Sequence, residues 1–579
     1  MNRRDLLLTA ALSIPLAGLA GPAVGKRARP RARIGADIAW TTYQAQDMKT
    51  TGTVMGPQYG PYLVQMESAH QTCVRLAAGQ HIEFKAAAAA NTLVVRYSLP
   101  DSADGRGIDS TLLVFRNGKP LPPIAITSRF CRLYGDYPFV NDPAAGKPRN
   151  FYDDARVKGL TLAKGDVIRL EKPTDAAEYC IIDIVDLEHA PPPLRRPRNS
   201  VSLTDFGADR TGESDATAAL QACLAAAAAQ GRTAWAPPGT YKLTGDVEMP
   251  SGVRLQGAGM WHTTFAGDEQ LYDRPGRRLR FKLTGSNSTL CDFALDGRIK
   301  YRNDGEQNDG IFGAHGRNCT ISRLWIEHTK VGMWFYVCSN MLIEGCRLRN
   351  TKADGINLCV DTRDCIVRNC TARNTGDDCF AIWPAPSDQG FSQEGAAPGD
   401  NVISCCTAET PFLAQGGAIY GGAGNRIEDC LFRDIASGCG ILISTTFPTT
   451  DGKIDNNFSG TTVVKNCELI RCGGYDQGWM WRAALQICLH RRDISGLAIS
   501  DVTIRDSLSD GIAVVNAADS PRTLRDARLE RVRVGAYGAA VPGRHGLWIA
   551  ALAQGGLVLV QSTIPDIANG SAEFQVSAQ

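Results

Sequence analysis

The chain has 579 residues, of which 44% are hydrophobic and 21% are charged, and this length exceeds what one ordinary domain needs. Its 62 lysines and arginines nearly balance its 60 aspartates and glutamates, so the chain has no net basic field to attract nucleic acid. A neutral polymer is an easier partner than a polyanion, and 59 glycines suit a turn-rich β protein better than a helical one.

Residues 1–30 have the pattern of an export signal. Arg3 and Arg4 precede an apolar stretch that reaches about Ala20 and ends in small residues. A proline and several glycines interrupt this stretch, which is shorter than the roughly 20 apolar residues of a membrane-spanning helix. The pattern predicts a twin-arginine signal that is cleaved near Ala20 or Ala23. The mature protein is then expected to be periplasmic or secreted and not bound to a membrane.

Residues 31–190 contain separate strands in which apolar and polar residues alternate, such as 92–97 and 111–115. Turn signals between such strands favour an antiparallel β-sandwich. The basic, proline-rich segment 191–198 marks the end of this domain, and its prolines predict a stiff spacer rather than a flexible one. A second domain is expected over residues 199–579.

The second domain is predicted to begin with a capping element. Residues 215–225 are alanine-rich and have the pattern of a helix, and a proline-glycine turn follows at 237–241. Because the ends of a stacked repeat protein must be covered, this helix is expected to cover the first repeat.

An internal repeat of the form Ile/Val-x-x-Cys runs from about residue 318 to 535. A second short apolar strand follows each copy. A leucine-rich repeat has a similar period but needs leucines and an asparagine at fixed places, so a right-handed parallel β-helix fits better, with coils about 4.8 Å apart. The repeat position is occupied, at steps of 22, 24, 36, 24, 37 and 35 residues, by Leu324, Cys346, Cys370, Cys406, Cys430, Cys467 and Val502.

The 19 cysteines follow this repeat rather than the spacing of a disulfide framework, which is typical of short chains with small cores. We therefore expect them to be small, inward-facing apolar side chains and free thiols. The chain lacks the CxxC pairs of a structural zinc site. No metal or other cofactor is predicted.

Three aspartates are the strongest candidates for chemistry. Asp354 and Asp378 are 24 residues apart, and each follows a repeat cysteine by 8 residues, so the two carboxylates are expected to lie on adjacent coils. Asp377 precedes Asp378 directly, and Gly376 allows the turn that would expose both. An inverting glycosidase needs a carboxylic acid for the leaving oxygen and a carboxylate that activates water. Asp354 and Asp378 could hold that water, with Asp377 as the acid.

Aspartate before glycine is also a common turn signal, and a single aspartate of this kind is better read as a turn residue. Three carboxylates that converge in two adjacent coils favour a functional site instead. Further residues near the same coils are predicted to contact the substrate: Asp309, Glu327, His328, Trp334 and Trp383.

The segments 307–313, 325–334, 353–357 and 374–378 together resemble glycoside hydrolase family 87, the α-1,3-glucanases and mycodextranases. The resemblance implies a right-handed β-helix, an inverting mechanism and three catalytic aspartates, which correspond here to Asp354, Asp377 and Asp378. By wider analogy with polygalacturonase-like β-helices, it implies that Asp377 is the acid.

The resemblance extends upstream of the aspartates. Residues 201–209 resemble the opening of the pectate-lyase-type superfamily, and residues 94–101 and 182–188 resemble the jelly-roll, carbohydrate-binding-module-like sandwich that precedes such catalytic solenoids. An exported, monomeric hydrolase of an α-glucan is therefore expected. No motif separates α-1,3-glucan from a nigeran-like glucan of alternating α-1,3 and α-1,4 linkages.

Two other functions are compatible with the same architecture. A polysaccharide lyase or polygalacturonase-like enzyme would act on an anionic uronate polymer, which the near-neutral charge balance does not demand. A non-catalytic glycan-binding solenoid would use the acidic cluster only to bind a cation. Products that absorb in the ultraviolet would favour the lyase, and retention of function after Asp377→Asn would favour the binder.

Overall fold

The computed structural model describes residues 33–268, 279–306, 308–388, 390–392, 399–447, 457–476, 480–516 and 521–579. Residues 34–579 form one compact unit, whereas the predicted signal at 1–30 lies outside the described residues. In the described part of the chain, no helix has the length and apolar character needed to cross a membrane.

The first part of this unit is an antiparallel β-sandwich, which confirms the prediction. Strands such as those at 81–85 and 167–171 alternate between more and less buried side chains. The two sheets bury their facing sides against each other around Leu112, Leu170 and Ile182. One sheet has the order β3 (Thr53–Met55), β4 (Cys73–Ala77), β11 (Tyr179–Glu188), β6 (Ala90–Ser98), β9 (Asp153–Leu162), with β1 (Trp40–Gln44) also on β11. The other has the order β2 (Lys49–Thr50), β5 (His81–Lys85), β10 (Val167–Glu171), β7 (Asp109–Arg116), β8 (Lys119–Thr127).

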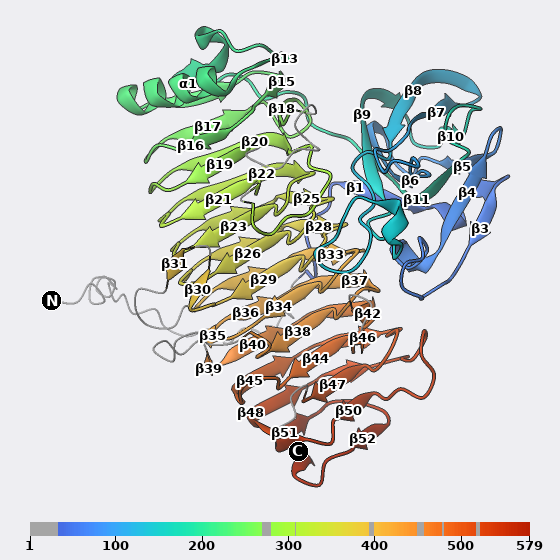
Figure 1. Cartoon of the computed structure of the whole chain (residues 1–579), viewed down its shortest axis with the longest axis vertical. Helices are drawn as coiled ribbons and strands as arrows, with labels where there is room; N and C mark the ends of the chain where they lie inside the picture. Colours follow the sequence, from blue (N-terminus) through green and yellow to red (C-terminus); the bar gives the residue numbers. More distant parts are fainter. Residues whose placement is uncertain are drawn as a thin grey trace, which may run out of the picture. The chain divides into compact units, whose positions relative to one another are not determined.

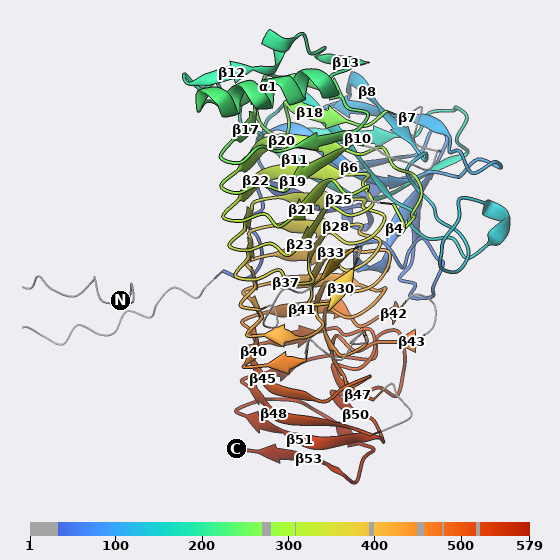
Figure 2. The ribbon, with the colours of Figure 1, turned by 60° about the vertical axis from the view of Figure 1, so that its left-hand side comes forward.

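The helix predicted at 215–225 is α1 (Thr217–Gln230), and it ends later than expected. The Asp215 carboxylate accepts a hydrogen bond of 3.0 Å from the Thr217 backbone N–H and so satisfies one free donor at the helix start. Gly231 ends the helix with a left-handed φ of 59°, which glycine adopts more readily than most residues. Leu220 and Leu224 point into the solenoid core, so α1 covers the first coils (Figures 1 and 2).

The rest of the unit is a parallel β-solenoid with three short strands per coil. Each coil therefore has three faces, and its last strand lies on the third face. The strands of this third face stack in a twelve-stranded parallel sheet. This sheet consists of β16 (Asp246–Glu248), β19 (Arg280–Leu283), β21 (Ile311–Ala314), β23 (Met333–Tyr336), β26 (Ile356–Cys359), β29 (Phe380–Trp383), β34 (Gly417–Ile419), β38 (Ile441–Ser444), β44 (Leu485–Cys488), β47 (Ile512–Val515), β50 (Leu547–Ile549) and β52 (Ile567–Asn569).

The other two faces are continuous with each other in a sheet of 24 strands, because some strands bend across the corner between them. In chain order these strands are β12 (Ser200–Ser202), β13 (Thr211–Asp215), β14 (Thr233–Ala236), β15 (Gly239–Lys242), β17 (Arg254–Gly257), β18 (Thr263–Ala266), β20 (Thr289–Asp296), β22 (Thr320–Glu327), β24 (Leu342–Glu344), β25 (Arg347–Arg349), β27 (Ile366–Arg368), β28 (Thr371–Arg373), β32 (Val402–Ser404), β33 (Thr407–Glu409), β36 (Arg426–Glu428), β37 (Leu431–Ile435), β40 (Thr462–Lys465), β41 (Glu468–Cys472), β45 (Ile494–Ser500), β46 (Thr503–Arg505), β48 (Arg522–Glu530), β49 (Arg533–Val534), β51 (Ala553–Val560) and β53 (Phe574–Ala578).

Short pairs of strands extend from the coils: β30 (Ser387–Asp388) with β31 (Phe391–Ser392), β35 (Gly422–Ala423) with β39 (Phe458–Ser459), and β42 (Tyr475–Asp476) with β43 (Met480–Trp481). They lie in or next to the longer repeats. The longer steps in the repeat are therefore insertions between strands and leave the stacking register of the sheets unchanged.

The predicted repeat register is confirmed. Ile343 pairs with Val367, Val367 with Ile403, and Ile403 with Ile427 along one face. The repeat cysteines lie inside the solenoid core, and all nineteen cysteines are free thiols, of which only Cys405 is not fully buried. Short inward side chains suit the narrow interior of a three-faced coil.

The sandwich packs on one corner of the solenoid through buried ion pairs. Arg347 holds Glu188 with two hydrogen bonds of 2.7 and 2.8 Å, and Arg373 donates to Asp186 at 2.9 Å. The proline-rich segment 191–198 follows the solenoid surface, where the Leu194 backbone N–H donates to the Ala258 carbonyl at 2.9 Å. Sandwich and solenoid, each with its own core, are therefore joined by a buried interface as well as by the spacer.

Candidate active site

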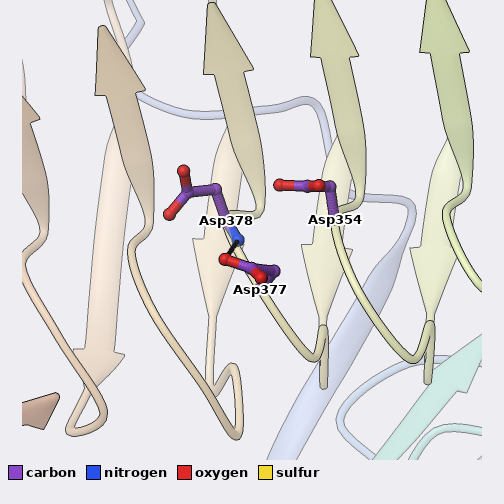
Figure 3. Close-up of side chains that lie close together, drawn as sticks. All are labelled: Asp354, Asp377 and Asp378. Carbon is purple, nitrogen blue, oxygen red and sulfur yellow. Dashed lines mark hydrogen bonds between the residues drawn. The ribbon is translucent and has the colours of Figure 1, made fainter. Parts of the chain in front are cut away.

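Asp354 and Asp378 occupy equivalent places on adjacent coils, as the 24-residue spacing predicts. Each lies two residues before a strand of the third face, and those strands pair Ile356 with Phe380. The Gly355 backbone N–H donates to the Asp378 carbonyl at 2.9 Å, which continues the ladder into the turns. Figure 3 shows the two side chains side by side on adjacent coils.

Asp377 lies between them on the same wall. The Thr375 hydroxyl donates to the Asp377 carbonyl at 2.9 Å, and the Asp378 backbone N–H donates to the Asp377 carboxylate at 3.2 Å (Figure 3). Gly376 permits this tight turn, because a Cβ there would lie 2.2 Å from the Lys352 carbonyl oxygen. One carboxylate oxygen from each of the three aspartates lies within 4.8 Å of the others.

The environments of the three carboxylates differ. Asp354 and Asp378 are buried, whereas the Asp377 side chain is 24% exposed. Burial, together with the neighbouring Asp377 charge, raises the pKa of Asp354 well above its usual value. Burial and the charges of Asp377 and Asp354 likewise raise the pKa of Asp378. Both shifts favour the protonated form of a carboxyl group in the cluster.

Hydrogen bonds orient Asp378. The Tyr420 hydroxyl donates to one Asp378 oxygen at 2.6 Å, and the Gln415 backbone N–H donates to the other at 3.1 Å. Both donors favour the ionised form and partly oppose the effect of burial on the pKa of Asp378.

Arg302 is a site residue that sequence reasoning missed. Its guanidinium donates to the Asp377 carboxylate at 2.8 Å and to the Gly376 carbonyl at 2.8 Å, and it also pairs with Asp304 at 2.9 Å. Only 10% of its side chain is exposed. Arg302 lies in the irregular segment between β20 and β21, where no repeat position or motif marks it.

These residues line a cleft of about 380 Å³. The predicted Trp334 and Trp383 both lie in its wall, and Trp383 packs against Phe447 with ring centres 5.0 Å apart. Apolar rings around a polar floor suit sugar rings with hydroxyl groups. The complete lining is Tyr137, Arg302, Asp304, Trp334, Ala353, Asp354, Asn357, Asp377, Asp378, Trp383, Asp388, Tyr420 and Phe447.

The cleft also contains unused hydrogen-bonding atoms. The Asn357 side-chain oxygen and the Trp383 indole N–H are buried without a partner in the described structure. Because buried polar atoms normally have hydrogen-bond partners, each of these two atoms needs a water or a ligand hydroxyl as its partner.

Glu327 and His328 are not cleft residues, which corrects the prediction that they contact substrate. Both are buried where the sandwich covers the solenoid. Glu327 pairs with Arg156 of the sandwich at 2.8 Å. His328 stands between Asp153 of the sandwich, at 2.9 Å, and Asp296 of the solenoid, at 2.8 Å. They join the two domains.

Asp309 lies at the same position in its coil as Asp354 does, but it is more buried than a substrate contact would be. Ile311 pairs with Met333, and Met333 with Ile356, so Asp309 lies two coils before Asp354 at the same corner. It is 2% exposed, lies 3.5 Å from the Lys330 ammonium group, and does not line the cleft. This placement corrects its predicted role as a sugar contact.

The three aspartates form the one group of three or more metal-ligating side chains found close together in the described ranges. Carboxylate oxygens are the donors that calcium prefers. The guanidinium of Arg302 already places a positive charge against Asp377, which reduces the electrostatic need for a cation at this cluster.

Comparisons with known proteins agree with this architecture. Residues 16–190 match the family model "Alpha-1,3-glucanase catalytic domain D1" and residues 212–556 match "Alpha-1,3-glucanase catalytic domain D2". The catalytic unit of the thermostable GH87 α-1,3-glucanase of Streptomyces thermodiastaticus strain HF3-3 is 28% identical, with a TM-score of 0.80 over 94% of this chain and 96% of that one.

Two further solved structures share the fold. The Agl-KA catalytic domain is 24% identical, with a TM-score of 0.85 over 96% of this chain and 100% of that one. The catalytic domain of a GH87 α-1,3-glucanase D1069A variant in complex with tetrasaccharides is 22% identical, with a TM-score of 0.81 over 94% and 99%.

The curated relatives are more distant and longer. Mannuronan C5-epimerase AlgE5 of Azotobacter vinelandii is 28% identical over 262 residues, or 42% of this chain. This chain spans about a quarter of the length of that relative, since the match covers 24% of it.

Proposed function

Because the chain belongs to the α-1,3-glucanase family, glycoside hydrolase family 87, we propose that it hydrolyses an α-glucan with α-1,3 linkages, and that Asp354, Asp377 and Asp378 carry the reaction. The observation that supports this most is the convergence of the three carboxylates within 4.8 Å in an aromatic-walled cleft. A family member bound to tetrasaccharides supports an oligosaccharide or polysaccharide substrate.

The reaction needs one proton for the leaving oxygen and one carboxylate that activates water. The raised pKa of Asp354 and of Asp378 favours a protonated carboxyl group among the three aspartates. The wider analogy with polygalacturonase-like β-helices assigns the acid role to Asp377. Because their pKa is raised, Asp354 and Asp378 are also candidates for the acid.

A leaving-group experiment separates these assignments. Each aspartate is replaced by alanine, and hydrolysis of an α-glucoside with an activated phenol leaving group is compared with hydrolysis of the glucan. Loss of the acid spares the activated substrate, because its leaving group needs no proton. Loss of the base slows both substrates, and added azide restores the rate by attacking in place of water.

Inversion is part of the proposal and rests on the family resemblance. The carboxyl groups of most inverting glycosidases are roughly 6.5–9.5 Å apart and those of retaining ones roughly 5–5.5 Å apart, so the 4.8 Å cluster requires a direct test. The anomeric protons of the first products are followed by NMR. Inversion of an α-linkage gives a β-anomer first, whereas an initial α-anomer contradicts it.

The function itself is tested by incubating the purified protein with a panel of α-glucans, β-glucans and pectins and measuring new reducing ends. We expect activity on α-1,3-glucan, with Asp354→Asn, Asp377→Asn and Asp378→Asn each losing about three orders of magnitude in kcat. Asp364→Asn is the matched control, because Asp364 is exposed on the coil of Asp354. Nigeran in the panel tests the mycodextranase-like specificity.

A polysaccharide lyase is the second candidate, because the same carboxylate cluster could ligate a cation. Loss of activity on chelation, with ultraviolet-absorbing products from an anionic uronate polymer, would establish the lyase. New reducing ends without such absorbance, unaffected by chelation, support the hydrolase.

We also propose that the protein is exported by the twin-arginine route and acts as a monomer. Arg3→Lys together with Arg4→Lys should leave the chain inside cells that carry the transport system. Light scattering of the purified protein should give the mass of one chain.

A further inference from the structure

A second cavity adjoins the cleft, between a sandwich loop and a solenoid loop. This groove has a volume of about 540 Å³. Five of its lining residues come from the sandwich loop, namely Tyr137, Pro138, Phe139, Val140 and Asn141, and five from the solenoid loop, namely Tyr301, Arg302, Asn303, Asp304 and Gly305. Three residues, Tyr137, Arg302 and Asp304, line both the groove and the cleft. The groove is therefore an extension of the cleft that contains the aspartates.

Tyr137 stands at the junction as an exposed but fixed aromatic ring. It is 60% exposed, more than the intermediate burial typical of tyrosine. Its hydroxyl donates to the Asp304 carboxylate at 2.9 Å. Its ring meets Phe139 edge to face, with centres 5.9 Å apart at 89°, and Phe139 is itself buried against Phe412 and Leu413 of the solenoid.

A ring that is held at both its edge and its hydroxyl loses little conformational freedom when a ligand stacks on it. Sugars stack on such faces through their C–H groups, and the apolar side chain Val140, 45% exposed, adds surface to the same groove. The groove therefore has a preorganised platform for a pyranose ring.

The polar groups of the groove fit a neutral ligand. Arg302 is shared by Asp304 at 2.9 Å and Asp377 at 2.8 Å, so it offers no uncompensated positive charge to an anionic sugar. The Asn141 side-chain oxygen is buried without a hydrogen-bond partner in the described structure and can accept from a hydroxyl group. These features favour a neutral glucan over a uronate polymer.

The groove is also tied directly to the aspartates. Arg302 forms part of its wall and donates both to the Asp377 carboxylate and to the Gly376 carbonyl at 2.8 Å. A chain bound in the groove would thus lie against the residue that orients Asp377.

We propose that this groove binds glucosyl units of the polymer next to the bond that is cleaved, and that Tyr137 of the sandwich is the stacking platform for one of them. The proposal rests on the proposed function, since it names an extended subsite of the same enzyme. It assigns the sandwich a direct part in substrate binding, through a loop that faces the active-site cleft.

The test compares Tyr137→Ala, Tyr137→Phe and the wild-type protein on polymeric α-1,3-glucan and on a short α-1,3-linked oligosaccharide. Val54→Ala is the control, because Val54 is an exposed apolar residue of the same domain that does not line the groove. Tyr137→Ala should raise KM for the polymer about tenfold, the factor that a stacking contact of this type supplies. Its kcat should change less than twofold, and its product lengths should shift.

Tyr137→Phe keeps the ring and loses only the hydroxyl bond to Asp304, so it should retain a KM within about threefold of the wild-type value. The short oligosaccharide should show a smaller effect of Tyr137→Ala than the polymer. Thermal unfolding of each variant shows that the fold is intact, as expected for an exposed side chain.

The outcomes separate the two proposals. If the wild-type protein cleaves α-1,3-glucan but Tyr137→Ala keeps the wild-type KM and products, the groove assignment is overturned and the hydrolase stands. Equal losses on both substrates, or a loss confined to kcat, would also overturn it. If the wild-type protein cleaves no α-glucan, both proposals fall together.

Discussion

Replacement of His328 by leucine is expected to destabilise the joint between the domains in a pH-dependent way. Burial alone would lower the pKa of His328, but Asp153 and Asp296 outweigh it and raise the pKa from 6.5 to about 10. The ring also stacks on Phe130, with centres 4.3 Å apart. His328 is therefore a buried cation between a carboxylate of the sandwich and one of the solenoid.

The expected magnitude follows from this shift in pKa. A shift from 6.5 to about 10 corresponds to about 5 kcal/mol, at about 1.36 kcal/mol per pKa unit. This agrees with the roughly 3–5 kcal/mol lost when one partner of a buried ion pair is removed. Asp153 and Asp296 would remain buried without their shared cation in the variant.

The sign of the pH dependence is fixed by the direction of the shift. Since the folded-state pKa of His328 lies above the unfolded value, its contribution is complete below about pH 6.5 and disappears as the pH rises towards 10. The difference between wild-type protein and His328→Leu should be about 5 kcal/mol at pH 6, about 3 at pH 8 and about 1 at pH 9.5.

The assay is urea unfolding followed by circular dichroism and tryptophan fluorescence at these three pH values. The comparison uses the first transition, because a two-domain protein need not unfold in one step. His189→Gln is the control, since His189 is exposed at the end of the sandwich. A stability difference that stays constant from pH 6 to 9.5, or that is absent at pH 6, would refute the assignment of a buried imidazolium.

Three further predictions concern the site and the core. Tyr420→Phe removes the 2.6 Å hydrogen bond to Asp378, so kcat should fall about tenfold. Loss of this donor should also raise the pKa of Asp378 further, which moves the acidic limb of the pH–rate profile to higher pH if Asp378 works as a carboxylate. An unchanged profile would contradict this. Gly376→Ala places a Cβ 2.2 Å from the Lys352 carbonyl oxygen and should reduce kcat at least about 100-fold by shifting Asp377, with the circular dichroism spectrum unchanged; wild-type kcat would show that the turn has room. Titration with a thiol reagent should find nineteen thiols only after denaturation, and a reductant should leave the melting temperature unchanged; a reductant-sensitive melting temperature would reveal a disulfide.

Much of the solenoid could be predicted because its information is local and periodic. The 24-residue spacing of Cys346 and Cys370 fixes the register of two coils, and that register carries Asp354 and Asp378 into adjacent turns. A strand register depends on which residues face inward, and that choice is visible in the sequence. The antiparallel sandwich could likewise be predicted, from the alternation of apolar and polar residues in its strands.

What could not be predicted depends on contacts between distant segments. Glu327 is the last residue of β22 and His328 follows it, as residues of the cleft could also do. Nothing within the repeat indicates that a second domain covers that corner. Arg302 and Tyr137 belong to irregular loops. Arg302 reaches Asp377 from a distant loop of the solenoid, and Tyr137 reaches the cleft only because the sandwich packs on the solenoid. Sequence periodicity describes the coils well and describes the surfaces that meet between domains poorly.

The joint between sandwich and solenoid has a consequence for protein engineering. The turns that carry the aspartates are held from the sandwich side, where Arg96 donates to Asn374 at 3.1 Å and Asn350 donates to Asp153 at 3.0 Å. An accessory binding module can normally be exchanged at its linker, and the proline-rich segment 191–198 is the position that such a design would choose. Chimeras made at that point would lose one wall of the catalytic centre and the supports behind it, so the smallest transferable enzyme is the pair of domains together.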